Sequence, residues 1–215
     1  IIVGSHILQI NDIKEERFNP MGVSDAELAE LHTKKFAVMD DAVGEKMQER
    51  ILQAKSELNS VGGVIEAIAL HLPAGIGAPY FDSVESMLSH ALFSVPAVKG
   101  VEFGDGFGFA RLTGAEANDA LHYVDGKVKA LTNHNGGITG GITNGMPFVV
   151  RVAIKPTPSI AREQQTVSLK EQADTTLAIV GRHDPCIVQR AVPVIEAVVA
   201  WTLWDLLLEA KKWEK

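Results

Sequence analysis

Hydrophobic positions along this chain follow two periods, one of two residues and one of three to four, and these periods predict its elements. Residues 1–10 form a β-rich apolar run and predict a strand that starts at the first residue. From Asp40 the apolar positions recur every three or four residues as far as Leu58, which predicts the clearest amphipathic helix, with Gly62-Gly63 as its stop. Further strands are expected over 64–72, 98–103, 148–154 and 175–180.

Short polar motifs predict where the other helices begin. Ser24-Asp25-Ala26-Glu27 is a capping box that opens a short helix, and Asp82-Ser83-Val84-Glu85 is a second one. A C-terminal helix is expected to begin at Pro193, because proline is tolerated in a first helical turn. The order of elements indicates an α/β (α+β) fold. Residues 1–215 are read as one domain, since no segment is rich enough in Pro, Ser or charge to separate two.

Composition limits the class of protein. With 215 residues, 46% of them hydrophobic, the chain can bury a substantial core. The net charge of −7 argues against a general nucleic-acid binder. The longest uncharged stretch near the C-terminus, residues 197–204, is shorter than the ~20 residues of a membrane span, so no span is expected. The first residues do not have the pattern of a secretory leader. Cys186 is the single cysteine, which excludes an internal disulfide and fits a reducing cytoplasm.

Candidate chemistry gathers around a glycine-rich run. Five glycines lie between Gly136 and Gly145, and bare backbone N–H groups in such a run can approach an anion closely. Arg151, Lys155 and Arg182 follow within a few tens of residues and suggest a local cationic cluster. The run therefore predicts a site for a phosphate-bearing ligand, although tight turns alone would also explain it. No histidine spacing suits a metal, and no metal site is expected.

Six segments carry a resemblance to a known family: residues 61–64, 73–77, 94–107, 133–145, 155–159 and 181–186. In sequence and in order they resemble chorismate synthase, and the resemblance covers nearly all of the chain. The family's N-terminal portion, with its Gly-Glu-Ser-His-Gly signature, has no counterpart. The chain therefore resembles roughly the last three-fifths of such an enzyme, an N-terminally truncated domain. The family's catalytic histidines belong to the missing portion, and none of the histidines here takes their role.

The resemblance implies a β-α-β sandwich, with helices layered between antiparallel sheets and incomplete at the N-terminus. It implies a lyase that catalyses the FMN-dependent anti-1,4-elimination of phosphate from 5-enolpyruvylshikimate 3-phosphate. The product is chorismate, for aromatic amino acid biosynthesis in the shikimate pathway. Reduced FMN, NADPH, a cytoplasmic location and a homotetramer are implied too, with no nucleic-acid or membrane partner.

The family's functional residues fall on named positions of this chain. Its flavin contacts correspond to Pro96, Ala97, Gly140, Lys155, Pro156, Thr157, Pro158, Ser159 and Arg182. Other members often have Asn at the Pro96 position, so a backbone contact is expected there. Asp184 corresponds to a carboxylate near the flavin, which implies a proton relay. The sequence leaves three roles open for His183: a core residue, a hydrogen-bond donor to a residue that contacts the ligand, and a substrate contact. Cys186, beside a proline, is expected to be a buried small hydrophobe.

Two functions of different class remain. The first is an FMN-dependent chorismate synthase, and the second is a catalytically inactive flavin-binding or assembly fragment. Because the Gly-Glu-Ser-His-Gly segment has no counterpart, the 215-residue chain alone is expected to be inactive.

Overall fold

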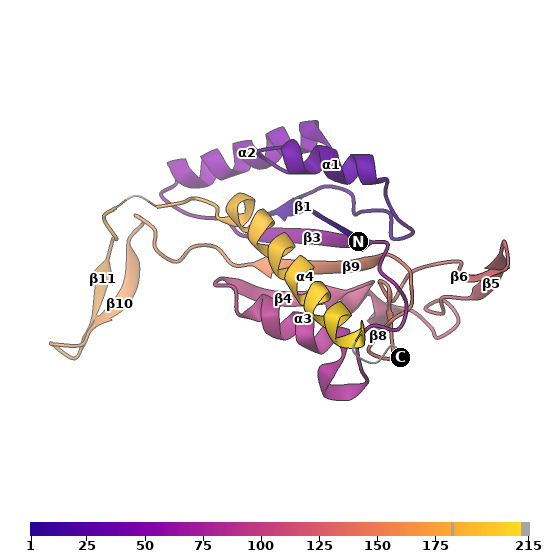
Figure 1. The fold of residues 1–215 in the computed structure, drawn as a ribbon. Coiled ribbons are helices and arrows are strands. Elements are labelled where there is room, and N and C mark those ends of the chain that lie inside the picture. Colours follow the sequence, from indigo (N-terminus) through magenta and orange to yellow (C-terminus); the bar gives the residue numbers. More distant parts are fainter. Residues whose placement is uncertain (182, 212–215) are drawn as a thin grey trace.

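A five-stranded antiparallel sheet forms the centre of the computed structural model, which describes residues 1–181 and 183–211 (Figure 1). Its strand order is β2-β1-β3-β9-β4. The bounds are β1 (Ile2–Ile10), β2 (Ile13–Lys14), β3 (Gly63–Leu70), β4 (Val98–Phe103) and β9 (Phe148–Ile154). The four longer strands, β1, β3, β4 and β9, confirm the strands expected at 1–10, 64–72, 98–103 and 148–154. The mixed α/β class with antiparallel strands is confirmed as well.

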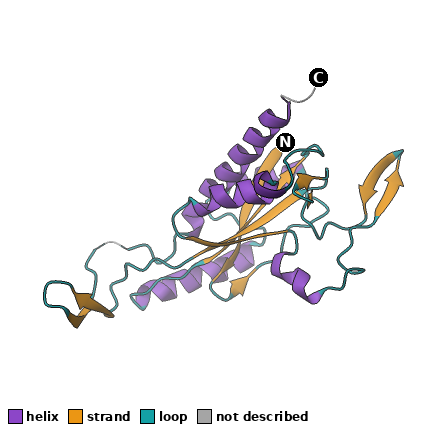
Figure 2. Ribbon diagram, turned by 90° about the horizontal axis from the view of Figure 1, so that it is seen from below, coloured by secondary structure: helices purple, strands orange, loops and turns teal. Residues whose placement is uncertain are grey.

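Alternating residues of the central strand β3 point to two separate cores. Ile65 and Ala67 contribute to the larger core, while Ile68 and Leu70 contribute to the smaller one. Helices α3 (Val84–Phe93) and α4 (Val188–Lys211) pack on the larger core, which also takes the buried side of α2 (Asp41–Ser56). Helix α1 (Asp25–Thr33) lies over the smaller core. Helices therefore cover both faces of the sheet (Figure 2).

The starts of α1, α2 and α3 agree closely with the sequence, whereas the stop of α2 and the start of α4 do not. Ser24 forms the expected capping box of α1, and Asp40 caps α2 through Ala42 N and Val43 N. The second capping motif is displaced by one residue, because Ser83 caps α3 by accepting a hydrogen bond from Ser86 N. The predicted stop of α2 at Gly62-Gly63 is wrong. The helix ends at Ser56, and Gly63 is the first residue of β3, where a Cβ would lie 2.0 Å from Gln9 O.

Helix α4 is longer than predicted. It begins at Val188, so Pro193 lies inside the helix and not in its first turn. The longer helix has 24 residues, 18 consecutive ones of which have a mean hydropathy of 1.7, so it meets the length and composition criteria for a membrane span. A core helix meets the same criteria, and α4 packs one side on the sheet.

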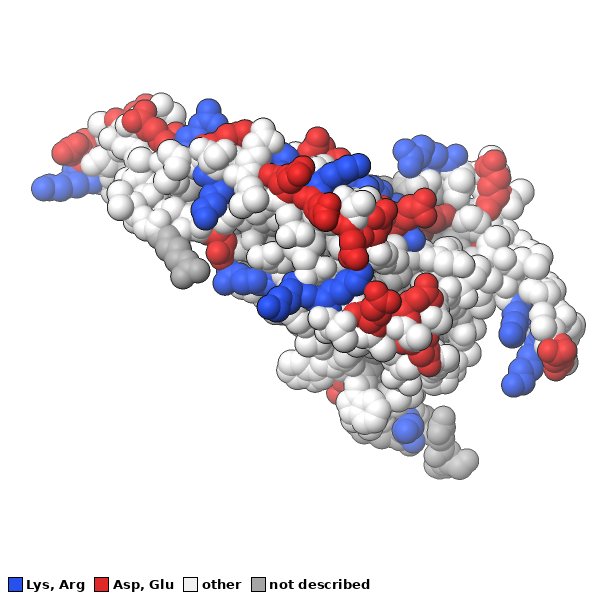
Figure 3. Space-filling view, turned by 90° about the horizontal axis from the view of Figure 1, so that it is seen from above, with Lys and Arg blue, Asp and Glu red and all other residues white. Residues whose placement is uncertain are grey.

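Three two-stranded hairpins extend from the sheet. They are β5 (Leu121–Val124) with β6 (Lys127–Ala130), β7 (Ile138–Thr139) with β8 (Ile142–Thr143), and β10 (Gln164–Ser168) with β11 (Ala173–Leu177). The strand expected at 175–180 is thus present, but it begins and ends earlier. The β5–β6 and β10–β11 hairpins project from opposite ends of the molecule (Figure 1). Seen from above α1 and α2, basic and acidic side chains are interspersed (Figure 3), as on an ordinary solvated surface.

Candidate functional site

One end of the sheet brings together two of the segments that carry the resemblance. Strands β4 and β9 are antiparallel with Val98 opposite Ile154, so the residues before β4 and after β9 meet. Lys155 N donates a hydrogen bond to Ala97 O at 2.9 Å. Ala97 has a φ of +75°, a left-handed conformation that is uncommon for a residue with a Cβ. The structure therefore places Pro96 and Ala97 beside the loop of residues 155–159.

The loop after β9 is held from the β3 side and contains an unsatisfied hydroxyl. Ser60 Oγ donates to Thr157 O at 2.6 Å. A Cβ on Gly62 would lie 2.3 Å from Ile154 O, so the close approach needs glycine there. Thr157 Oγ1 is buried, with no hydrogen-bond partner among the described residues. Because a buried unpaired hydroxyl costs free energy, Thr157 has the character of a group that awaits a ligand.

The segment that contains Asp184 joins the same end of the sheet. Val61 N donates to Pro185 O at 2.8 Å. Asp184 forms an ion pair with Arg190, and its side chain is 40% exposed. His183 is half-buried, with Nε2 3.0 Å from Ile179 O. Cys186 is buried, as expected, and burial raises the pKa of its thiol. Arg182, a predicted flavin contact, lies outside the described residues.

Gly140 lies elsewhere. It is at the tip of the β7–β8 hairpin, with φ of +63° followed by +86° at Gly141. The hairpin packs on the start of α3, where Val84 N donates to Gly141 O at 3.0 Å. The glycine run precedes β9 and Lys155 follows it, so about the length of this seven-residue strand, roughly 20 Å, separates them. Within one chain, Gly140 is therefore not beside the other predicted flavin contacts.

The predicted cationic cluster at the glycine run is wrong for Arg151. Arg151 is 3% exposed. Its guanidinium donates to Glu102 at 2.5 Å, to Glu66 at 3.2 Å and to the carbonyl of Gly104. The alternation of β9 points this side chain into the sheet's own polar row, so it is not free to bind a ligand anion.

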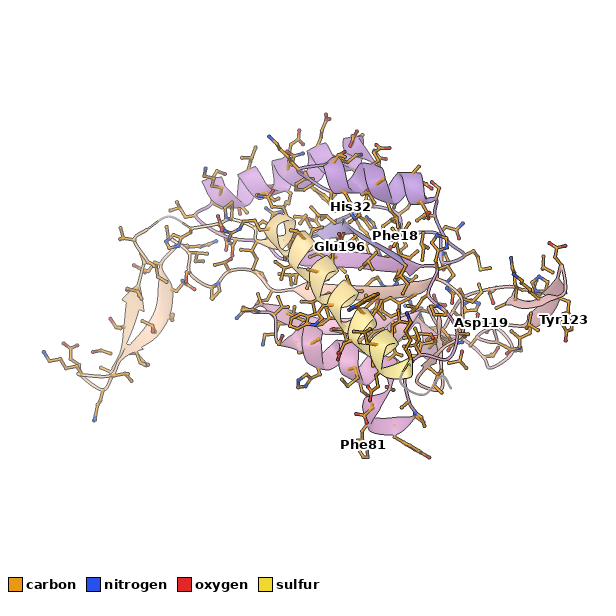
Figure 4. All side chains as sticks on the ribbon, viewed as in Figure 1. Phe18, His32, Phe81, Asp119, Tyr123 and Glu196 are labelled. Atoms are coloured by element: carbon orange, nitrogen blue, oxygen red, sulfur yellow. The ribbon has the colours of Figure 1, made fainter. Side chains whose placement is uncertain are left out.

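That polar row crosses four strands and was not predicted. His6, Glu66, Arg151 and Glu102 are consecutive cross-strand neighbours, from β1 through β3 and β9 to β4. The segment before α1 covers the row, with the Phe18 ring 4.3 Å from the His6 ring (Figure 4). The signal in the sequence was a titratable residue inside each of four largely apolar strands, although β1 and β4 contain other polar residues as well. Without the register, nothing shows that the four residues are neighbours.

The row carries opposed charges in a buried setting. His6 contacts Glu15 through Nδ1, and its Nε2 lies 3.1 Å from Glu66. Burial disfavours the charged imidazole, but these two carboxylates outweigh it, and the pKa of His6 is raised. Burial also opposes ionisation of Glu66, yet hydrogen bonds from His6 and Phe18 N hold the pKa of that carboxyl below its usual value. Two buried carboxylates thus favour the protonated form of His6, and Arg151 shares one of them, Glu66.

A large cleft lies beside the glycine run, at the other end of β9 from the cluster of predicted flavin contacts. It has a volume of about 1210 Å³, and its lining includes Asn135, Thr139 and Asn144 of the run and Lys127 and Lys129 of β6. The run thus lines a cleft, as a ligand loop would. The cations there come from β6 and not from Arg151 or Lys155.

Asp119 fixes the conformation of the residues that lead into the glycine-rich run. It accepts hydrogen bonds from Thr132 Oγ1, His134 N and Asn135 N at 2.8 to 3.0 Å. Burial opposes its ionisation, but these donors lower the pKa of the carboxyl. Among the described residues no group of His, Cys, Asp and Glu could hold a metal ion.

Comparison with known proteins assigns this arrangement to a family. The chorismate synthase family profile matches residues 1–208. The chorismate synthase of Thermococcus gammatolerans is 50% identical over 175 residues, which is 81% of this chain and 49% of that protein. The chorismate synthase of Crocosphaera subtropica is 45% identical over 208 residues, 96% of this chain and 56% of that protein.

A solved structure gives the same assignment. A crystal structure of chorismate synthase superposes with a TM-score of 0.76 at 29% identity, covering 96% of this chain and 56% of the other. The chain spans about half the length of the curated relatives that it matches.

Proposed function

The chain belongs to the chorismate synthase family, and on that premise we propose that it supplies part of the flavin site of a chorismate synthase. The activity proposed is the elimination of phosphate from 5-enolpyruvylshikimate 3-phosphate to give chorismate, with reduced FMN as cofactor. This activity belongs to the fold assembled at the length of the relatives. The 215 residues alone are expected to bind flavin weakly and to form no chorismate.

One observation carries the proposal: three separate segments meet at one end of the sheet and present groups suited to a flavin phosphate. Lys155 is an exposed cation next to the turned backbone of Ala97. The buried Thr157 hydroxyl has hydrogen-bonding capacity to spare. Cations and oriented hydroxyl donors are what an anionic phosphate requires. The residues present therefore fit FMN, and Arg182 would add a planar bidentate donor.

Each residue has a proposed task at this end of the sheet. Lys155 and Thr157 would hold the phosphate of FMN, and the backbone of residues 96–97 would contact the flavin. When bound, reduced FMN supplies electron density to the substrate ring as phosphate leaves. Asp184 accepts and passes on the proton lost from the ring, and its 40% exposed carboxylate is accessible for this task. Gly140 lies near the far end of β9, too distant within one chain to contact the same flavin as the other residues.

The experiment compares the 215-residue chain with a chimera that joins it to the unmatched half of the Thermococcus gammatolerans enzyme. FMN binding is measured by fluorescence titration, and chorismate formation is assayed anaerobically with chemically reduced FMN. We expect FMN binding by both proteins, tighter in the chimera, and turnover by the chimera alone. A chimera that binds FMN without turnover would favour the alternative, a flavin-binding or assembly fragment. Absence of FMN binding in both would refute the proposal.

The remaining expectations depend on the same premise. A biosynthetic enzyme of this family works in the cytoplasm, and NADPH would be the source of electrons for the flavin. A homotetramer is proposed for the assembled protein and is tested by analytical ultracentrifugation of the chimera.

A further inference from the structure

Residues 15–23 join β2 to α1 and cover the polar row, and we call this segment the strap. The strap leaves the sheet at Glu15, whose backbone N donates a hydrogen bond to Leu8 O at 3.0 Å. Only two of its residues are buried, Glu15 and Phe18, at 6% and 2% exposure. Both meet the fully buried His6 of β1, since Glu15 contacts Nδ1 and the Phe18 ring lies 4.3 Å from the imidazole ring (Figure 4). The buried contacts of the strap are therefore centred on one histidine.

The contacts of His6 require a protonated ring. Its two nitrogens face different carboxylates, because Nδ1 contacts Glu15 and Nε2 lies 3.1 Å from Glu66. An ionised carboxylate only accepts hydrogen bonds, and a neutral imidazole carries a single N–H group. Only the doubly protonated ring can therefore donate to both carboxylates. After the loss of one proton, one ring nitrogen presents its lone pair to a carboxylate oxygen, and that contact becomes repulsive.

The other charged groups around His6 do not replace this proton. Arg151 of β9 lies 3.2 Å from Glu66 and 2.5 Å from Glu102 of β4, so it serves the far side of the row. Among the described residues, His6 is the only cation that contacts Glu15. The remaining charged groups of the strap and of the helix starts beside it have partners of their own: Arg17 with Glu102, Asp25 with His71, Glu27 with Ser24, Glu30 with Lys34, and Asp40 with the first turn of α2.

When His6 loses its proton, the strap is the side that can move. Glu66 lies in the central strand β3, which is paired on both sides, and Arg151 still holds its carboxylate. Glu15 accepts hydrogen bonds from the backbone N–H groups of residues 39 and 40 at 3.0 and 3.1 Å, so its carboxylate stays satisfied without His6. Phe18 N donates to Glu66 at 2.6 Å, and that bond is broken when the strap leaves the sheet.

The far end of the strap forms part of the cleft beside the glycine run. Residues 21–23 line that cleft, and Pro20 O accepts a hydrogen bond from Asn133 Nδ2 at 2.7 Å. Movement of the strap therefore changes the access to the cleft. We propose that the strap is a proton-controlled lid: protonated His6 holds it on the sheet, and loss of that proton releases it and widens the cleft. This device does not depend on the proposed activity.

The test is hydrogen exchange of the 215-residue chain, followed by mass spectrometry between pH 6 and pH 9 and corrected for the intrinsic pH dependence of exchange. An open strap uncovers His6, whose ordinary pKa is 6.5, whereas Glu15 and Glu66 raise that pKa in the closed state against the effect of burial. From pH 6.5 upward, the protection of the strap amides should therefore fall by up to about tenfold per pH unit until His6 has lost its proton. The amides of β3 should stay protected, because the sheet remains folded.

Three variants separate the proton from the shape of the site. His6→Gln carries no charge at any pH, so its strap should exchange rapidly already at pH 6. Glu15→Gln can pair with a neutral ring through its amide, so its strap should stay protected up to pH 9. This second variant keeps the test valid if His6→Gln does not fold. The control is Glu16→Gln, an exposed neighbour in the strap, which should behave as the wild type does.

A second measurement reports on the cleft itself. Spin labels on Met21→Cys and Lys129→Cys, two positions that line the cleft, should move apart between pH 6 and pH 9, while the buried Cys186 stays unlabelled. An unchanged distance between the labels would overturn the proposal. So would a strap that is equally protected at pH 6 and pH 9. Simultaneous loss of protection in the strap and in β3 would also overturn it, because the chain would then unfold as a whole.

Discussion

The buried hydroxyl of Thr157 gives the most direct residue-scale test of the flavin site. Thr157 Oγ1 has no partner among the described residues, so it contributes no hydrogen bond to the fold. Thr157→Val should therefore leave the free energy of unfolding unchanged or raise it slightly, because an unsatisfied buried group is removed. FMN affinity should fall about 5–10-fold if the hydroxyl donates to the flavin. The control is Ser60→Ala, which breaks the bond to Thr157 O and should lower stability instead. Unchanged FMN affinity in Thr157→Val would remove this residue from the site.

Asp184 has two competing roles, a proton relay and a structural partner of Arg190. In the chimera, Asp184→Asn should lower turnover about 10²–10⁴-fold while FMN affinity is largely kept, because the shape stays and the proton acceptor is lost. Arg190→Gln breaks the same ion pair from the other side. If Asp184 only stabilises the fold, both variants should lose the same small amount of stability and turn over alike. Normal turnover in Asp184→Asn would contradict the relay.

His6 makes stability depend on pH. Its pKa is raised in the fold, against burial, by Glu15 and Glu66. The stabilisation is therefore complete below the ordinary value near 6.5 and is lost as pH rises through the higher folded value. As pH rises above 6.5 we expect the free energy of unfolding to fall, measured by urea denaturation at a series of pH values. His6→Gln should be less stable at pH 6 and lose this pH dependence. A wild-type profile as flat as that of the variant would contradict the assignment.

At the scale of elements, two substitutions in the β7–β8 turn distinguish the cost of backbone strain from the cost of a steric clash. Gly140 and Gly141 both have positive φ, so alanine at either position costs about 1–2 kcal/mol. A Cβ on Gly140 meets nothing within 4 Å, but on Gly141 it would lie 2.7 Å from Ser83 Cβ. Gly141→Ala should therefore destabilise the chain by at least about 1 kcal/mol more than Gly140→Ala. FMN titration of Gly140→Ala tests the predicted contact, and unchanged affinity there would argue against it.

The sequence predicted which residues form an element better than it predicted which elements lie next to one another. Strands β1, β3, β4 and β9 follow from apolar runs, and the start of α2 follows from Asp40, because these signals are local. The stop at Gly62-Gly63 was misread because glycine serves a close approach to Gln9 as readily as it ends a helix. The start of α4 was misread because packing on the sheet overrides the preference of Pro193 for a first turn.

The same limit applies to the candidate site. The juxtaposition of Ala97 and Lys155 depends on strand pairing, and so does the capture of Arg151 by Glu66 and Glu102. Neither can be read from spacing along the chain. The residues of the site were available from the family resemblance, whereas the distance of Gly140 from them required the fold.

At the scale of the whole molecule, the central sheet with its helices, which we call the body, should fold without the β10–β11 hairpin, which we call the arm. Strands β10 and β11 pair only with each other among the described elements, and every residue of β11 is exposed. An isolated two-stranded hairpin is marginally stable in water, so the arm adds little to the body. Gln164 pairs with Leu177, so the two ends of the arm lie side by side, and Gly-Gly can replace residues 164–177. The melting temperature should change by less than about 2 °C, measured by circular dichroism. Limited proteolysis should cleave the intact chain first at the tip, residues 169–172, which the shortened chain lacks. A large loss of stability on excision would show that the arm contributes to the core of the fold.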